Sequence, residues 1–165
     1  LRICVKQRFS KNLHPLLGVL FTIRCGHIFS DNVFSNIHPN DRFYLGGADT
    51  IRGYSKDTLP PLGSYTTADG KTGYTVQGGK SLLQINVELR QRISKNTELQ
   101  FFHDLGSLGQ NSPQELLRHI YRTIGAGTRI YTPVGIVKFD IGYKLSSSYP
   151  DEHSYNWHLS FDGSF

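Results

Sequence analysis

Apolar and polar side chains alternate along most of this chain with a period of two. In residues 83–93 the apolar positions are all leucine, isoleucine or valine, and they alternate with Gln84, Asn86, Glu88, Arg90 and Arg92. Successive side chains of a β-strand point to opposite faces, so this pattern predicts a strand with one apolar and one polar face. Seven segments show it: residues 1–10, 16–29, 83–93, 98–105, 120–132, 137–145 and 155–165. The sequence therefore predicts an all-β protein with antiparallel strands.

The character of the two faces favours a membrane barrel over a soluble β-sandwich, which would also alternate. The polar face carries charge in every segment, and the apolar face carries aromatic residues near strand ends, namely Phe9, Phe29, Tyr143, Tyr155 and Trp157. In a transmembrane barrel the apolar face contacts lipid, aromatic girdles mark both interfaces, and the polar face lines a wet interior.

The lengths of the connections favour the same architecture. Short connections (residues 10–15, 94–96 and 133–135) alternate with long ones (residues 30–79, 106–119 and 146–154). Up-and-down transmembrane β-barrels have short turns on one side and long loops on the other. The mean hydropathy is −0.34, and no stretch approaches the roughly 18–20 apolar residues that a membrane helix needs. We therefore expect an antiparallel up-and-down transmembrane β-barrel.

Motifs from residue 46 to the end of the sequence carry a family resemblance. The first is Gly46-Gly47-Ala48-Asp49-Thr50-Ile51-Arg52-Gly53-Tyr54, within the long connection. It is followed in order by Asn86-Val87-Glu88-Leu89-Arg90, Phe101-Phe102-His103-Asp104-Leu105-Gly106, the glycine-rich stretch 125–140, and Trp157-x-Leu159-x-Phe161-x-Gly163-x-Phe165. Together they resemble the BamA-type outer-membrane barrel-assembly superfamily, which includes TamA and the two-partner-secretion pores. Gly135-Ile136 departs from the Gly-Pro that is usual there.

The resemblance implies that residues 1–165 are the C-terminal part of a barrel domain, about the last seven strands of sixteen. Earlier strands and POTRA domains would lie outside this sequence, and residues 30–79 would enter the barrel lumen. It further implies a protein of the bacterial outer membrane that assembles or translocates other proteins without enzymatic chemistry. The expected partners are outer-membrane lipid, nascent β-barrel clients and accessory assembly proteins.

Arg52 is the first candidate site residue. An arginine has five donors in a fixed fork and can bind two carboxylates. The resemblance implies that it pairs with Glu88 and Asp104, which both fall on the polar face. Alternatively, Arg52 is solvated, the two acids are ordinary lumen charges, and Asp104 forms a turn before Gly106.

The rest of the motif and three further charges complete the candidate site. Gly46, Gly47 and Gly53 would give the motif backbone freedom beside Ile51 and Tyr54. The inward charges Arg129, Lys138 and Asp140 form either a lumen network or a set of solvated side chains.

The last strand, residues 155–165, is the second candidate site. Trp157, Leu159, Phe161 and Phe165 share one parity, which predicts a lipid-facing row ending in a C-terminal aromatic signal at the membrane rim. Gly163 would weaken local strand pairing. This strand would form one side of a barrel seam. Lateral opening of that seam would let a client strand pair with its edge, as in β-augmentation. The alternatives are a two-partner-secretion or TamA-like translocation pore, and a barrel with a purely structural role.

Other functions fit the sequence poorly. The net charge is +5, but the basic residues form no block, so no nucleic-acid partner is expected. The histidines lack metal-binding spacings, and no metal or cofactor is expected. His158, Ser160 and Asp162 share a face but lie about 6–7 Å apart, too far for a catalytic triad. A hairpin turning near Leu13 would set Cys4 opposite position 22, which leaves Cys4 and Cys25 as free thiols.

Overall fold

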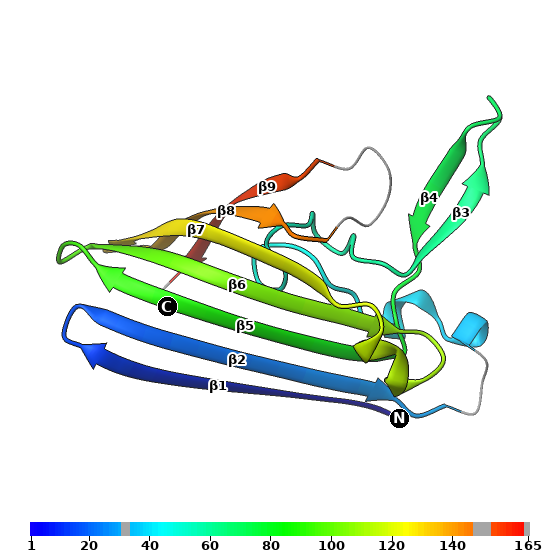
Figure 1. The fold of residues 1–165 in the computed structure, drawn as a ribbon, viewed down its shortest axis with the longest axis horizontal. Coiled ribbons are helices and arrows are strands. Elements are labelled where there is room, and N and C mark those ends of the chain that lie inside the picture. Colours follow the sequence, from blue (N-terminus) through cyan, green and yellow to red (C-terminus); the bar gives the residue numbers. More distant parts are fainter. Residues whose placement is uncertain (31–33, 147–152, 164–165) are drawn as a thin grey trace.

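A computed structural model describes residues 1–30, 34–146 and 153–163. Seven long antiparallel strands form one curved sheet in chain order (Figure 1). They are β1 (Arg2–His14), β2 (Leu17–Ile28), β5 (Ser81–Arg92), β6 (Thr97–Gly109), β7 (Tyr121–Thr132), β8 (Gly135–Lys144) and β9 (Tyr155–Gly163). The predicted antiparallel, up-and-down all-β fold is confirmed. The sheet is open, with β1 and β9 as its edges.

The alternation of residues along β5 sorts its side chains onto two different surfaces. Asn86 and Glu88 are 7% and 8% exposed, whereas Val87 and Leu89 are 37% and 39% exposed. The polar face (the inner face) is therefore covered by protein, and the apolar face (the outer face) is open. A soluble β-protein places its faces the other way round, whereas a transmembrane barrel has this arrangement.

The segment between β2 and β5, residues 30–79, is the lumen loop. It begins with two short 3-10 helices, η1 (Phe34–Asn36) and η2 (Pro39–Asp41). Its apolar residues pack against the ends of β2, β5 and β6 in one cluster: Ile28, Ile37, Phe43, Leu45, Ile51, Tyr54, Leu59, Leu82 and Leu108. The cluster holds the loop against the inner face. Among the described residues, no helix has the length and apolar character needed to cross a membrane.

The lumen loop also contains a hairpin that was not predicted. β3 (Leu62–Thr66) pairs with β4 (Thr72–Val76) in a separate two-stranded sheet that projects away from the main one (Figure 1). Its turn is closed by hydrogen bonds between Thr67 and Lys71 and contains Gly70 at φ +75°. A third short helix, η3 (Pro113–Leu117), lies between β6 and β7.

The register of the first hairpin corrects the expected position of the cysteines. Cys4 lies opposite Gly26, four residues further along than predicted, because β1 continues to His14 and the turn follows it. Cys25 lies opposite Val5, so the two thiols fall on opposite faces of the sheet. Both cysteines are free, as expected.

Candidate functional site

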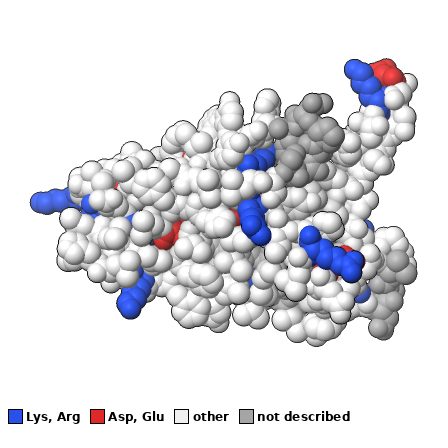
Figure 2. Space-filling view, in the orientation of Figure 1, with Lys and Arg blue, Asp and Glu red and all other residues white. Residues whose placement is uncertain are grey.

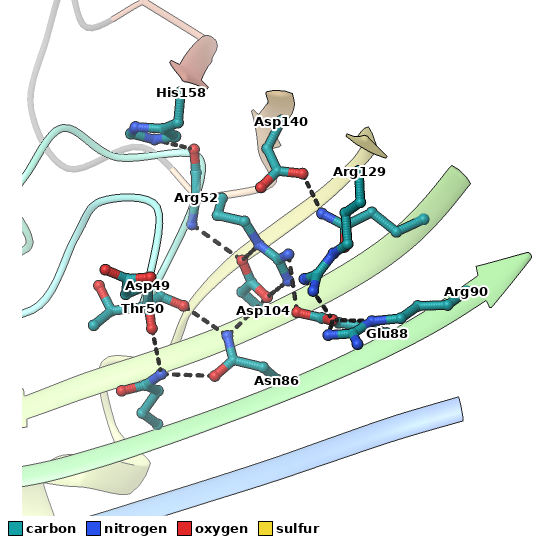
Figure 3. A network of polar contacts seen from close by, with 12 residues as sticks. Asp49, Thr50, Arg52, Asn86, Glu88, Arg90, Asp104, Arg129, Asp140 and His158 are labelled. Carbon is teal, nitrogen blue, oxygen red and sulfur yellow. Dashed lines mark hydrogen bonds and ion pairs between the residues drawn. The ribbon is translucent and has the colours of Figure 1, made fainter. Parts of the chain in front are cut away.

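The Arg52 side chain reaches from the lumen loop to the inner face of the sheet, where it meets Asp104 (Figure 3). Its Nε and Nη2 donate hydrogen bonds to the two Asp104 carboxylate oxygens at 2.9 and 2.7 Å, and the Arg52 backbone N–H donates to the same carboxylate at 3.0 Å. Asp104 is fully buried and Arg52 is 3% exposed. A paired fork of this kind is the strongest geometry that an arginine makes with a carboxylate.

Glu88 forms an ion pair with the remaining nitrogen of the guanidinium. Arg52 Nη1 lies 3.0 Å from Glu88 Oε1, and the Glu88 Oε2 atom also contacts Arg90 at 2.6 Å and Arg129 at 3.3 Å. The guanidinium carbon lies 3.5 Å from the centre of the Phe102 ring, which adds a cation–π contact. The structure thus brings together the three residues of the proposed loop anchor: Arg52 from the lumen loop, Glu88 from β5 and Asp104 from β6.

The charges around Arg52 keep it protonated despite its burial. Burial by itself lowers the pKa of Arg52, but the hydrogen bond to Asp104 and the negative charges of Asp104 and Glu88 outweigh it. The net effect raises the pKa above its ordinary value. Arg52 therefore stays protonated throughout the physiological pH range.

Two amide side chains extend the clamp along β5 to the loop backbone. Asn86 Nδ2 donates to Asp104 Oδ1 at 2.8 Å and contacts the Thr50 carbonyl at 2.6 Å. Gln84 Nε2 donates to Asn86 Oδ1 at 2.6 Å and contacts the Asp49 carbonyl at 3.4 Å. The sequence placed both amides on the inner face but gave them no role. They bind the carbonyl groups of Asp49 and Thr50 and so connect the motif backbone to β5.

The glycines of the motif are required by the loop conformation and by close packing. Gly46 and Gly47 have φ values of +113° and +105°, which side-chain-bearing residues rarely adopt. A Cβ atom on Gly53 would lie 2.6 Å from Thr123 Oγ1 on β7. A Cβ atom on Gly142 of β8 would lie 2.7 Å from the Arg52 carbonyl oxygen. The loop backbone therefore sits directly on strands β7 and β8.

The apolar residues on either side of Arg52 secure the ends of the motif. Ile51 is fully buried in the apolar cluster, beneath Gly106 of β6. Tyr54 is also fully buried, donates its hydroxyl to the Ser146 carbonyl, and packs edge-on against Tyr121 at 6.0 Å between ring centres. The tyrosine ring thus spans from the motif to the long-loop end of the barrel wall.

His158 is a contact residue that the sequence gave no reason to choose. Its Nε2 lies 2.8 Å from the Arg52 carbonyl oxygen (Figure 3). Asn156, two residues earlier on the same strand, donates to the Ser55 hydroxyl at 3.1 Å. Both lie on β9, so the lumen loop contacts the edge strand as well as the middle of the sheet. The only signal for His158 in the sequence was its position on the inward-facing parity of the last strand.

The other predicted inward charges separate into two groups. Arg129 Nε donates to Gln100 Oε1 at 2.6 Å, and Gln100 donates in turn to Asp140. Lys138 pairs instead with Asp162 on β9, at 3.0 Å. Within the described part of the chain, no cluster of histidine, cysteine and acidic residues has the arrangement of a metal site.

The C-terminal strand presents the predicted row of apolar residues. Trp157, Leu159 and Phe161 are 61%, 66% and 60% exposed, on the outer face. Gly163 is paired with Gly135 of β8. Phe165 lies outside the described residues.

The model of the Omp85 superfamily domain matches residues 6–165 of this chain. The chain belongs to the Omp85 superfamily. Among solved structures, it is similar to BamA from Haemophilus ducreyi lacking POTRA domains 1–3, with a TM-score of 0.75 and 15% sequence identity. The match covers 98% of this chain but 35% of that one, and at this identity it shows a common fold. The resemblance found in the sequence is confirmed, and the chain is a member of a family of outer-membrane β-barrel proteins for protein assembly and translocation.

Proposed function

We propose that this chain is the C-terminal part of an outer-membrane assembly factor that folds and inserts other β-barrel proteins. The observation that carries the proposal is the docking of the motif loop. The Arg52 clamp joins it to the middle of the sheet, and His158 and Asn156 join it to β9. β9 is one of the two edge strands of the described sheet, and its only strand partner there is β8. An assembly factor needs a fixed barrel wall beside an edge that a client strand can pair with.

Insertion of this kind requires binding and positioning without covalent chemistry. An exposed strand edge offers a row of N–H and C=O groups that pair with an incoming strand. In hydrocarbon, unpaired backbone groups are very costly, so a client strand gains most by pairing as it enters the membrane. We propose nascent β-barrels as clients, accessory proteins as partners, and no enzymatic activity or cofactor. Earlier strands and POTRA domains would complete the protein.

A translocation pore is the second candidate, because the inner face encloses a polar hollow. Its volume is about 560 Å³, and its lining includes Lys6, Arg8, Arg90, Arg129 and Asp162. A charged, wet passage of this kind suits an exported unfolded chain. In that case the lumen loop would have to move to widen the passage.

Reconstitution of the full-length protein in liposomes separates the two candidates. For the assembly factor, an unfolded barrel client added outside should become folded in the bilayer at a rate well above that of empty liposomes. A secretion pore should instead move a soluble partner across the bilayer without accelerating the folding of clients. Transport without accelerated folding would reject the proposed function and favour the pore. The R52A variant adds a second contrast: release of the loop should reduce client folding by an assembly factor, whereas it should widen the passage of a pore and leave transport unreduced.

A further inference from the structure

A pair of arginines, one on β7 and one in the connection before it, lies at the long-loop end of the sheet, beside an outer face where apolar side chains predominate. Arg122 is the second residue of β7. Its neighbour Thr123 is fully buried on the inner face, so Arg122 must point outward, like Ile124. Arg118 caps the helix η3 just before it. Together they border a hollow of about 300 Å³, the rim hollow, which is lined by Leu117, Arg118, Ile120, Arg122, Leu145 and Ser146.

Both guanidinium groups are available to a ligand. Within residues 1–30, 34–146 and 153–163, neither side chain has a hydrogen bond or an ion pair, and both residues are exposed. Among the described residues, the acid that interacts electrostatically with Arg118 is Glu115, and its carboxylate already accepts N–H groups from Gln110 at 2.8 Å and Asn111 at 3.3 Å. The rim hollow therefore carries excess positive charge.

The rim hollow lies just beyond the apolar outer surface, at the level where lipid headgroups would lie in a membrane. Ile124 lies opposite Tyr143, which lies opposite Tyr155, and all three are exposed on the outer face. Aromatic side chains of barrels mark the boundary between hydrocarbon and headgroups. Arg122 lies two residues further toward the long loops, about 6–7 Å beyond this row at roughly 3.3 Å per residue. On the face that Figure 2 draws, most of the surface over the strands is uncharged.

We propose that the rim hollow binds the phosphate headgroup of an anionic lipid in the leaflet on the long-loop side. Two arginine forks match phosphate oxygens in charge and geometry. The leucines at positions 117 and 145 and the row of Ile124, Tyr143 and Tyr155 would contact the acyl chains. A free phosphate ion would use the arginines but gain nothing from this apolar surface. The assignment depends on the membrane barrel alone and not on client insertion.

The test is native mass spectrometry of the full-length protein taken from bilayers of phosphatidylcholine containing a minor fraction of phosphatidylglycerol. The wild type should retain phosphatidylglycerol, and R118Q/R122Q should retain on the order of tenfold less, which corresponds to a loss of about 1.4 kcal/mol. The control K11Q/K95Q removes the same charge at the short-turn end and should retain as much as the wild type. If the double variant does not fold, the single variant R122Q takes its place, with a smaller loss.

Three results would overturn the assignment. Undiminished lipid retention in the arginine variant would show that the rim hollow is not the binding site. Equal losses in both double variants would indicate attraction to net charge alone. Displacement of the lipid by millimolar inorganic phosphate would indicate a site for free phosphate. None of these results bears on client insertion, which is measured separately.

Discussion

Replacement of Arg52 by alanine should release the lumen loop, mainly through its effect on Asp104. In the wild type this buried carboxylate accepts two hydrogen bonds from the guanidinium, one from the Arg52 backbone and one from Asn86. The substitution removes the first two and with them the cation that neutralises the carboxylate. Breaking a buried ion pair by removing one partner costs about 3–5 kcal/mol. The loss should appear in the free energy of loop opening.

The structure also predicts how this cost divides between the two acids. Asp104 is left without a cation, whereas Glu88 keeps contacts to Arg90 at 2.6 Å and Arg129 at 3.3 Å. Double-mutant coupling should therefore reach about 2–3 kcal/mol for Arg52 with Asp104, and about 1 kcal/mol or less for Arg52 with Glu88.

Arg92 and Glu98 provide a matched control on the same sheet. Their ion pair measures 3.1 Å, but the Arg92 side chain is 55% exposed. Glu98 is buried, but the exposed guanidinium of Arg92 is screened by solvent, so this pair should couple by no more than about 0.2–1 kcal/mol.

Native-state proteolysis measures these quantities. When opening and closing are faster than cleavage, the cleavage rate of the lumen loop reports the population of its open form. The rates would be measured for the full-length protein in vesicles, for wild type, single and double alanine variants of each pair. Coupling between Arg52 and Asp104 no larger than that between Arg92 and Glu98 would mean that the clamp is effectively solvated, and would refute the reasoning.

Three further predictions follow from the packing of the loop and the sheet. The first is tested with the native cysteines replaced by serine and single cysteines introduced on β5. Cysteines at the outward positions Ile85, Val87 and Leu89 should react with lipid-phase reagents, and those at the inward positions Gln84, Asn86 and Arg90 with aqueous reagents. Aqueous labelling of both sets would exclude a membrane sheet. Gly53→Val should prevent docking of the motif, because the added side chain would overlap Thr123. Its loop should be cleaved about as fast as that of the Arg52 variant, and wild-type resistance would contradict the close packing. His158→Ala should weaken the contact of the loop with β9 by about 0.5–1.5 kcal/mol without affecting the Arg52–Asp104 coupling. Double electron–electron resonance between spin labels on the loop and β9 should then show a broader distance distribution, and an unchanged distribution would assign His158 no part in that contact.

The strands and their faces could be predicted because strand periodicity is a local property. In residues 83–93 each inward or outward position follows directly from its neighbours, and the structure buries Gln84, Asn86 and Glu88 as that parity requires. Burial decreases toward the end of the strand, where Arg90 is half-buried and Arg92 is exposed. The pairing of Arg52 with Asp104 spans 52 residues and leaves no local signal. It was proposed because the surrounding motifs resemble a family, and parity placed both acids on the inner face.

The details that the sequence did not predict depend on tertiary packing or on weak local signals. The contact between His158 and Arg52 joins positions 106 residues apart and depends on the curvature of the sheet. The β3–β4 hairpin had a local signal, Asp69-Gly70 between two short stretches rich in tyrosine and threonine, of a type that favours tight turns. The register of Cys4 was wrong because a turn can close at several positions in a polar stretch such as residues 10–15.

Locking the barrel seam tests the central claim most directly. A disulfide would join a cysteine on β9 to one on the first strand of the full-length barrel, with Cys4 and Cys25 replaced by serine. If clients enter by pairing with the edge of β9, the locked protein should stay folded but lose client assembly in liposomes, and a reductant should restore it. Assembly at the wild-type rate with the disulfide intact would contradict insertion through this seam.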